Sequence, residues 1–248
     1  HDALPISRLM IGRSLTASPQ QHAAAVTKPA GNPWRLESFS VSVSRGEILG
    51  IAGIEGSGQE RLAEEILARS TTHRHSNMAI IPPDRNHDGI VAEMSLAENL
   101  FLGKKIANKK PWGYFNPAKL NNELRSFLTS NEVTPAEPDL SAGSLSGGNQ
   151  QKLVFARELS FCQDHPDQLL ICHPTRGVDV GAMELIHQKI REARNRGASI
   201  LLISSELDEL MSLSDRILVF RKNKIVGEVK PPFIEKQLGH LMLTGVIQ

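Results

Sequence analysis

Hydrophobic positions along the chain follow two different periods, which succeed one another repeatedly. Short apolar runs, typical of buried strands, occupy residues 48–53, 78–81, 169–171, 199–203 and 217–220. Apolar residues spaced as on one helix face occupy residues 60–68, 182–195 and 207–213. Residues 39–43 alternate apolar and polar side chains, which predicts a half-exposed strand. This order of strands and helices predicts an α/β fold with a mostly parallel sheet flanked by helices.

Residues 88–157 interrupt the alternation with a segment that we predict to be mainly helical. Ser95 and Glu98 have the spacing of a capping box, which predicts that a helix begins there. Pro117, directly after Asn116, is placed to open another helix. The α/β domain is therefore expected to carry a helical insertion.

The first 33 residues lack either period. Residues 14–33 are rich in Ala, Ser, Gln and Pro, which is typical of a linker. Residues 1–6, HDALPI, have no methionine and none of the regions of a signal peptide. They resemble the translated end of a sequencing adapter, so we expect that they do not belong to the native protein.

The composition restricts the class of protein further. The net charge is +1, from 28 basic and 27 acidic residues, which gives no reason to expect a nucleic-acid partner. Cys162 and Cys172 have neither metal-binding nor redox spacing, and the histidines show no ligand spacing, so no metal site of the protein's own is predicted. No apolar run approaches the ~20 residues of a membrane-spanning helix, so we expect any link to a membrane to run through a partner.

Residues 53–60, GIEGSGQE, have the frame of a P-loop between a strand and a helix. Backbone N–H groups of such a loop hold phosphate oxygens. The candidate phosphate-binding residues are Gly53, Gly56, Ser57, Gly58 and Gln59. Gln59 stands where a P-loop has its lysine, and Glu60 stands where it has the hydroxyl that holds Mg²⁺. These two changes predict weak nucleotide binding, and a plain glycine-rich turn is the alternative interpretation.

Residues 145–152, LSGGNQQK, form a second glycine-rich turn that leads into a helix. The positive end of a helix dipole, its free N–H groups and the hydroxyl of Ser146 together favour phosphate binding. A purely structural turn that caps the helix is the alternative.

The order of these motifs resembles the ATPases of ABC transporters. It continues with HPTRGVDVGA at residues 173–182 and ISSELDEL at 203–210. More narrowly, LSGGNQQK and PTRGVDVGA resemble the second ATP-binding half of the tandem ATPases that drive simple-sugar and nucleoside importers. The spelling ISSELDEL is nearest to the nucleoside branch. The resemblance covers about residues 7–245, with an ATP-binding domain at 34–245.

The resemblance implies an ABC-type, RecA-like sheet with a small β-subdomain and composite ATP sites shared between two halves. Ser146, Gly147 and Gly148 would contact the γ-phosphate of ATP held by the partner half. Asn149 and Gln150 would support that helix N-terminus, and Asp179 would cross the interface as the D-loop aspartate. The cofactors implied are ATP and, at the partner half's site, Mg²⁺.

Several other positions depart from the family pattern. Cys172 replaces the aspartate that orients Mg²⁺, and His173 replaces the glutamate that polarises water. Ser205 replaces the switch histidine, and Pro83 stands at the Q-loop. For Trp34 two interpretations stay open: stacking on adenine, and an exposed anchor of the linker. The joint loss of catalytic groups predicts two unequal sites, of which this chain's own holds nucleotide weakly or without turnover.

The implied partners are the N-terminal ATPase half of the same polypeptide, transmembrane permease subunits and, indirectly, a periplasmic or lipoprotein substrate-binding protein. The implied location is the cytoplasmic face of the membrane. Two alternatives stay open: an ABC protein without a transport role, and a regulatory or scaffold fragment that does not hydrolyse ATP. The sequence leaves the choice between nucleoside and sugar open.

Overall fold

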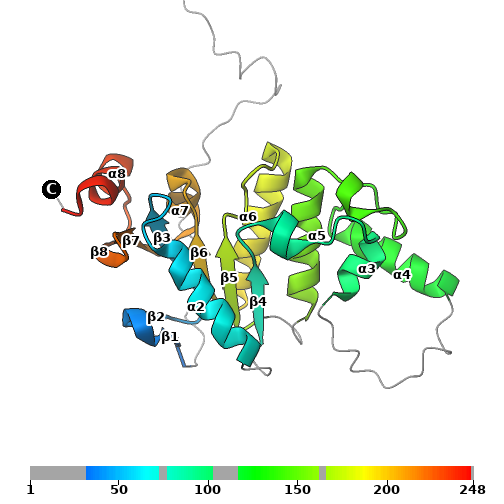
Figure 1. Ribbon diagram of the computed structural model, residues 1–248, viewed down its shortest axis with the longest axis horizontal. Coiled ribbons are helices and arrows are strands. Elements are labelled where there is room, and N and C mark those ends of the chain that lie inside the picture. Colours follow the sequence, from blue (N-terminus) through cyan, green and yellow to red (C-terminus); the bar gives the residue numbers. More distant parts are fainter. Residues whose placement is uncertain (1–31, 73–76, 103–116, 162–165, 247–248) are drawn as a thin grey trace, which may run out of the picture.

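A computed structural model of the chain describes residues 32–72, 77–102, 117–161 and 166–246. The proposed non-native residues 1–6, most of the linker and Cys162 lie outside these ranges. A six-stranded sheet forms the centre of the molecule (Figure 1). In spatial order its strands are β4 (Met78–Ile81), β5 (Gln168–Cys172), β6 (Ser199–Ile203), β3 (Glu47–Gly53), β7 (Arg216–Arg221) and β8 (Lys224–Val229). All neighbours are parallel except β7 and β8, so the predicted mostly parallel sheet is confirmed.

Helices and a small second sheet bury both faces of the central sheet. The helices are α2 (Gln59–Thr72), α5 (Gly147–Phe161), α6 (Val180–Asn195), α7 (Leu207–Leu213) and α8 (Glu235–Thr244). Successive residues of a strand point to opposite faces. Leu49 and Ile51 accordingly pack with Leu62 of α2, whereas Ile48 and Ala52 belong to the cluster that contains the helices of the other face.

The small sheet pairs β1 (Trp34–Leu36) with β2 (Val41–Val43), joined by the 3₁₀ turn η1 (Glu37–Phe39). The predicted strand at 39–43 begins too early, because Ser40 has left-handed backbone (φ 53°). Trp34 is only 8% exposed and packs in the core with Leu36 and Val43. The interpretation of Trp34 as an exposed anchor is therefore wrong, and little of its ring is free to stack on a base.

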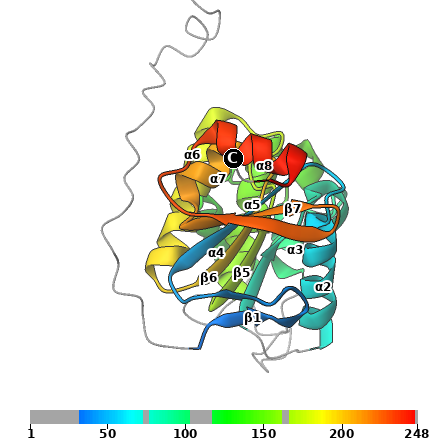
Figure 2. The same cartoon turned by 90° about the vertical axis from the view of Figure 1, so that its left-hand side faces the viewer.

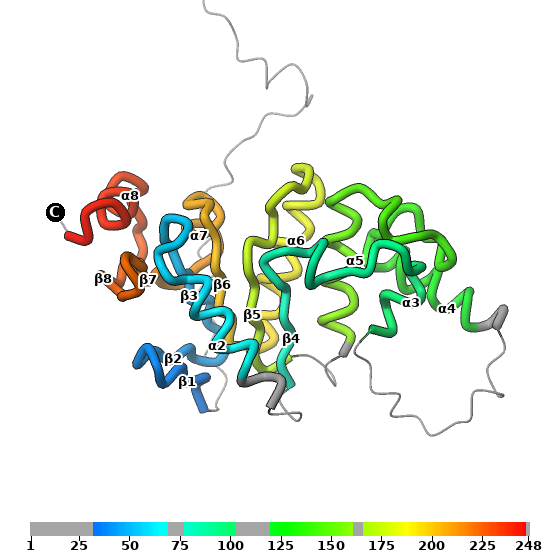
Figure 3. Tube along the Cα trace, viewed as in Figure 1, coloured from blue at the N-terminus to red at the C-terminus, as the bar shows by residue number. Residues whose placement is uncertain are grey.

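The helical insertion lies at the opposite end of the molecule from β8 and α8 (Figure 1). It contains α3 (Leu96–Phe101) and α4 (Pro117–Ser130) and leads into α5; the tube in Figure 3 shows this course of the chain. The predicted capping box is confirmed, because Ser95 N–H donates to Glu98 Oε2 (2.8 Å) and Glu98 N–H donates to Ser95 Oγ (3.2 Å). Between α4 and α5, however, the backbone forms turns and the short 3₁₀ helix η4 (Ala142–Ser144), so "mainly helical" holds only in part.

The strands β1 and β8, the helix α8 and the short turns η1 and η4 were not predicted. Figure 2 shows β1 at the opposite end of the molecule from α8 in that view. No helix in the described part of the chain combines the length and apolar character needed to cross a membrane.

The topology gathers the candidate site residues at one edge of the sheet. Strands β5, β6 and β3 are parallel neighbours, with Cys172 opposite Ile203 and Ile203 opposite Ile51. The segments that follow these strands must therefore meet at the carboxyl edge, which is where open α/β sheets bind ligands.

Candidate nucleotide site

The P-loop frame after β3 has the backbone that its glycines predict. Gly56 and Gly58 have φ values of 81° and 110°, which favour glycine. A Cβ on Gly58 would lie 2.8 Å from the Cα of Asn223. The Ser57 carbonyl accepts a hydrogen bond from the Asn223 N–H (2.8 Å). The loop is therefore folded and fixed against the turn between β7 and β8.

The side chain of Gln59 folds back into the loop. It is 2% exposed, and its Nε2 donates to the carbonyls of Ile54 (2.9 Å) and Gly53 (3.4 Å). Its Oε1 has no hydrogen-bond partner among the described atoms. A P-loop lysine would extend an ammonium toward phosphate, whereas the side-chain amide of Gln59 donates to carbonyls of the loop itself.

Glu60 places a carboxylate at the same loop. Its Oε1 accepts a hydrogen bond from the Gly56 N–H at 3.1 Å. That N–H belongs to the row of backbone donors which, in a P-loop, would face a phosphate. An anion built into the chain therefore takes a position that a bound anion would need.

A cavity of about 470 Å³ opens beside the loop, and most of its charges are negative. Four carboxylates line it: Glu55, Glu60, Glu206 and Glu209. Glu209 is buried, with Oε1 3.0 Å from His187 Nε2 and Oε2 without a hydrogen-bond partner among the described residues. Arg176 adds a positive charge to the residues that line this cavity. A polyphosphate would meet like charges here, so the residues present do not fit Mg-ATP.

Cys172 and His173 follow one another at the end of β5. Cys172 is 1% exposed, and burial raises the pKa of its thiol to about 12. It is therefore an uncharged core residue and cannot replace a Mg²⁺ carboxylate. Burial and the Arg176 guanidinium lower the pKa of His173 below its ordinary value, although Glu209, Glu60 and Glu55 oppose the shift. The lowered pKa makes this imidazole a weaker base than an ordinary histidine.

Ser205 and Pro83 are both exposed and lie beside neighbouring cavities. Ser205 lines the acidic cavity, and Pro83 lines a second one of about 330 Å³. His173, Arg176 and Gly177 line both cavities, which places the two side by side. Within the described ranges, no cluster of three or more His, Cys, Asp or Glu is arranged to hold a metal ion.

The second glycine-rich turn, within LSGGNQQK (residues 145–152) and called the signature turn below, presents a different surface. Ser146 is exposed and directly precedes α5. Its Oγ accepts hydrogen bonds from the backbone N–H (3.4 Å) and Nδ2 (3.0 Å) of Asn149. Asn149 Oδ1 in turn accepts from the Thr134 N–H (2.9 Å), and Gln150 Nε2 donates to the Ala142 carbonyl (3.2 Å). Asn149 and Gln150 thus connect the helix start to the preceding loops.

The signature glycines allow close packing against the segment after β5. A Cβ on Gly147 would lie 2.6 Å from the Gly177 carbonyl oxygen, and a Cβ on Gly148 would lie 2.6 Å from Asp179 Oδ2. Asp179 is the N-cap of α6, with Oδ1 accepting from the Ala182 N–H (2.9 Å). The structure therefore brings the predicted signature residues and the D-loop aspartate together, and it gives the glycines a packing role as well.

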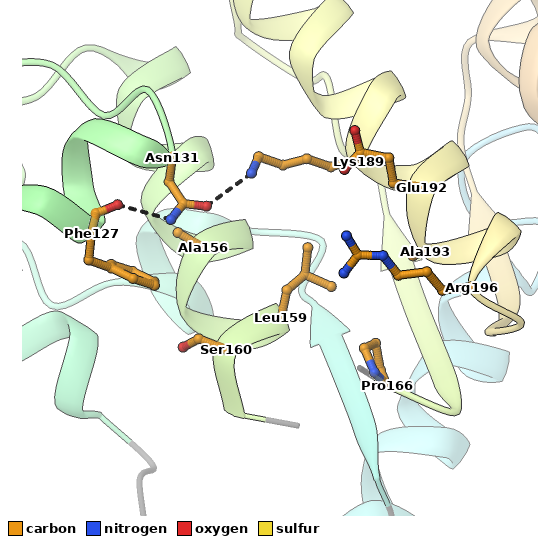
Figure 4. Close-up of a pocket in the computed structure, with 10 residues that line it drawn as sticks. All are labelled: Phe127, Asn131, Ala156, Leu159, Ser160, Pro166, Lys189, Glu192, Ala193 and Arg196. Carbon is orange, nitrogen blue, oxygen red and sulfur yellow. Dashed lines mark hydrogen bonds between the residues drawn. The ribbon is translucent and has the colours of Figure 1, made fainter. Parts of the chain in front are cut away.

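A further cavity of about 280 Å³ lies between α4, α5 and α6 and contains none of these motif residues (Figure 4). Lys189 Nζ donates to Asn131 Oδ1 (2.9 Å), and Asn131 Nδ2 donates to the Phe127 carbonyl (3.0 Å). The first bond connects α6 to the insertion and the second fixes Asn131 to the end of α4, so these residues serve the packing of the fold.

The sequence did not single out Arg85, Asn223 or Glu209. Asn223 lies outside every motif, and Glu209 lies within ISSELDEL (residues 203–210), whose letters do not indicate its contact with His187. Arg85 stands in the PPDR segment, but nothing in the letters indicates its contacts.

Comparison with known proteins gives sequence relatives of one kind. No protein-family model matches the chain. It is 36% identical to a nucleoside import ATP-binding protein of Lactococcus lactis, over 98% of this chain and 54% of that protein. It is 33% identical to a guanosine import ATP-binding protein of Bacillus subtilis and 36% identical to a ribose import ATP-binding protein of Geobacillus kaustophilus. These alignments cover 98% and 85% of this chain and 53% and 46% of those proteins. The chain thus spans about half the length of the relatives it matches.

Solved structures agree on the fold. A dimeric bacterial ABC transporter cassette superposes with a TM-score of 0.63 at 17% identity, over 79% of this chain and 90% of that one. An ATP-binding subunit of an ABC transporter gives a TM-score of 0.61 at 20% identity, over 81% and 85% of the two chains. The chain therefore has the fold of an ABC transporter ATP-binding cassette, and its sequence relatives are ATP-binding proteins for the import of nucleosides and sugars.

Proposed function

We propose that this chain is the second ATP-binding half of an ABC import ATPase, and that it completes the partner half's catalytic site without hydrolysing ATP at its own. The contact between Glu60 Oε1 and the Gly56 N–H carries the proposal, because it occupies a phosphate position with a carboxylate of the chain itself. The folded-back Gln59 and the buried Cys172 support it.

In the proposed assembly, the other half holds ATP and Mg²⁺ on an intact P-loop. Ser146, Gly147 and Gly148 of this chain complete that site, with the exposed hydroxyl of Ser146 and the N-terminus of α5 directed to phosphate. The site on this chain stays paired with the partner's signature but turns over no nucleotide. The cassette works at the cytoplasmic face of the membrane, against permease subunits that receive substrate from a binding protein.

The transported substrate in this proposal is a nucleoside or a simple sugar. Two of the named relatives are for nucleoside or guanosine import and one is for ribose import. Ribose is the sugar part of a nucleoside, which makes these substrates chemically related.

The test uses the protein that contains both halves. We expect Ser146→Arg to lower the ATPase rate by roughly 100-fold or more, because it removes a phosphate-facing hydroxyl and fills the site. Cys172→Ala should change the rate by less than about twofold, since the thiol is buried and uncharged.

Ser126→Arg is the matched control, because Ser126 is an exposed serine on α4, outside both motifs. It should leave the rate unchanged. Equal losses in Ser146→Arg and Cys172→Ala would contradict the proposed asymmetry.

A further inference from the structure

Arg85 connects three segments that are far apart in the sequence. Its Nη1 donates to the Arg176 carbonyl (2.6 Å) and its Nη2 donates to the Gly177 carbonyl (3.3 Å). Its Nε lies 3.4 Å from Gln150 Oε1 on α5. One guanidinium thus joins the segment after β4, the segment after β5 and the first turn of the signature helix.

The backbone before and after Arg85 holds it in this place. It begins the π-turn η2 (Arg85–Gly89), directly after the Pro82-Pro83-Asp84 sequence that ends β4. Asp84 Oδ1 caps the turn by accepting from the Asn86 N–H (2.9 Å), and the Ile90 N–H donates to the Arg85 carbonyl (2.8 Å). The side chain therefore starts from a fixed position.

Gly147 provides the space that the guanidinium occupies. A Cβ on Gly147 would lie 2.5 Å from Arg85 Nη2, so the guanidinium would have to move to make room for it. The same Cβ would lie 2.6 Å from the Gly177 oxygen that Arg85 binds. The contact therefore depends on two residues: Arg85 donates the hydrogen bonds, and Gly147, which has no Cβ, leaves room for the guanidinium.

We propose that Arg85 is a positioning residue that locks the start of α5 to the segment preceding Asp179, so that Ser146 and Asp179 face a partner half as one rigid unit. The proposal deepens the proposed function, because it names the residue that sets the geometry of the signature surface. Its structural part concerns this chain alone and does not depend on hydrolysis by another half.

An arginine suits this role better than a lysine. The guanidinium is planar and carries five N–H donors in a fixed fork, so it can bind two carbonyls and an amide oxygen at once. An ammonium is a point charge on a flexible stem and would hold at most part of this set.

Hydrogen–deuterium exchange on the 248-residue chain tests the structural part. In Arg85→Ala we expect amides of residues 147–152 and 176–182 to exchange roughly tenfold faster, because the contacts that close them are lost. Amides of the central sheet should keep their protection. Arg85→Lys should lie between wild type and Arg85→Ala. Gly147→Ala should accelerate the same two segments while Arg85 is still present, which tests the contact from its other side.

Arg125→Ala is the matched control. Arg125 also donates two hydrogen bonds, to Glu137 Oε1 (2.7 Å) and Oε2 (2.8 Å), but it touches neither segment. It should leave exchange in 147–152 and 176–182 unchanged. Faster exchange in Arg85→Ala that is uniform over the chain, or no faster than in Arg125→Ala, would overturn the proposal.

Steady-state ATPase of the protein with both halves separates this proposal from the proposed function. We expect Arg85→Ala to lower kcat about tenfold with KM for ATP changed less than twofold, because the P-loop that holds ATP belongs to the other half. Local exchange that accelerates without a fall in kcat would count against the proposed function but leave the positioning contact established. A rise in KM with kcat unchanged would contradict the role of Arg85 in setting the signature geometry.

Discussion

The two glycine-rich turns of this chain both lead into a helix N-terminus, but they differ in whether a carboxylate of the chain binds their N–H groups. Each precedes a helix whose first N–H groups have no backbone acceptor within the helix, an arrangement that favours anion binding. At the turn before α2, Glu60 supplies the anion from within the chain. At the turn before α5, the exposed Ser146 has only neighbouring donors on its oxygen, and no carboxylate of the described residues accepts from its N–H. In the proposed function, the first turn is therefore closed to phosphate and the second is open.

The difference shows that glycines alone do not determine whether such a loop can bind phosphate. Gly56 and Gly58 keep the left-handed backbone that a P-loop needs. The two positions that follow determine what the frame binds, since Gln59 uses the loop carbonyls and Glu60 uses a loop N–H. The loop thus has the backbone shape of a P-loop, although Gln59 and Glu60 provide no positive charge for a phosphate.

Among the variants that test this comparison on the chain itself, the largest effect is expected from restoring the P-loop residues at positions 59 and 60. We expect Gln59→Lys with Glu60→Thr to lower the Kd of the chain for ATP about thirtyfold, or ~2 kcal/mol, because it adds an ammonium and frees the Gly56 N–H. Isothermal titration calorimetry of wild type and double variant measures the change.

Glu64→Lys is the control for net charge, because it raises the net charge by two, as the double variant does, and Glu64 is exposed on the same helix outside the P-loop frame. It should not alter the affinity. Binding of ATP by wild type as tight as by the double variant would remove the distinction between the two turns.

The buried strands could be predicted well from the sequence, and the edges could not. Strands β5 and β6 are apolar after their first residues, Gln168 and Ser199, because helices cover both faces, so their letters alone indicate them. Strand β8 lies at the sheet edge with mostly half-exposed residues and a glycine, which leaves no clear period. The three residues of β1 are too few to show one.

The candidate site could be predicted as a set of motifs but not as a set of contacts. The replacements at Gln59, Glu60 and Cys172 are visible in the letters. That Glu60 reaches back to Gly56 depends on a rotamer, and Arg85 meets Gln150 and Arg176 across 65 and 91 residues of chain. Contacts of such separation depend on the tertiary fold, which no local pattern records.

A smaller effect distinguishes packing from phosphate binding at the signature turn. We expect Gly148→Ala to destabilise the chain by about 1–2 kcal/mol, because the new Cβ would meet Asp179 Oδ2 at 2.6 Å and Ala182 Cβ at 3.0 Å. Urea unfolding followed by circular dichroism measures the change.

Gly239→Ala on α8 is the matched control, since nothing lies within 4 Å of a Cβ there. It should stabilise the chain by about 0.5–1 kcal/mol through helix propensity. If both variants were stabilised alike, the signature glycine would have no packing role and would serve only the partner's phosphate.

The smallest effect separates the two roles of Asp179. Its Oδ1 caps α6 through the Ala182 N–H, while the residue is also exposed on the signature surface. We expect Asp179→Ala to cost about 1 kcal/mol in urea unfolding, because the helix loses its N-cap, and Asp179→Ser to cost less, because serine caps as well. In the two-half protein, both variants should lower the ATPase rate if the carboxylate acts across the interface. If Asp179→Ser retained full activity, Asp179 would belong to the packing of the open turn and not to its contact with a partner.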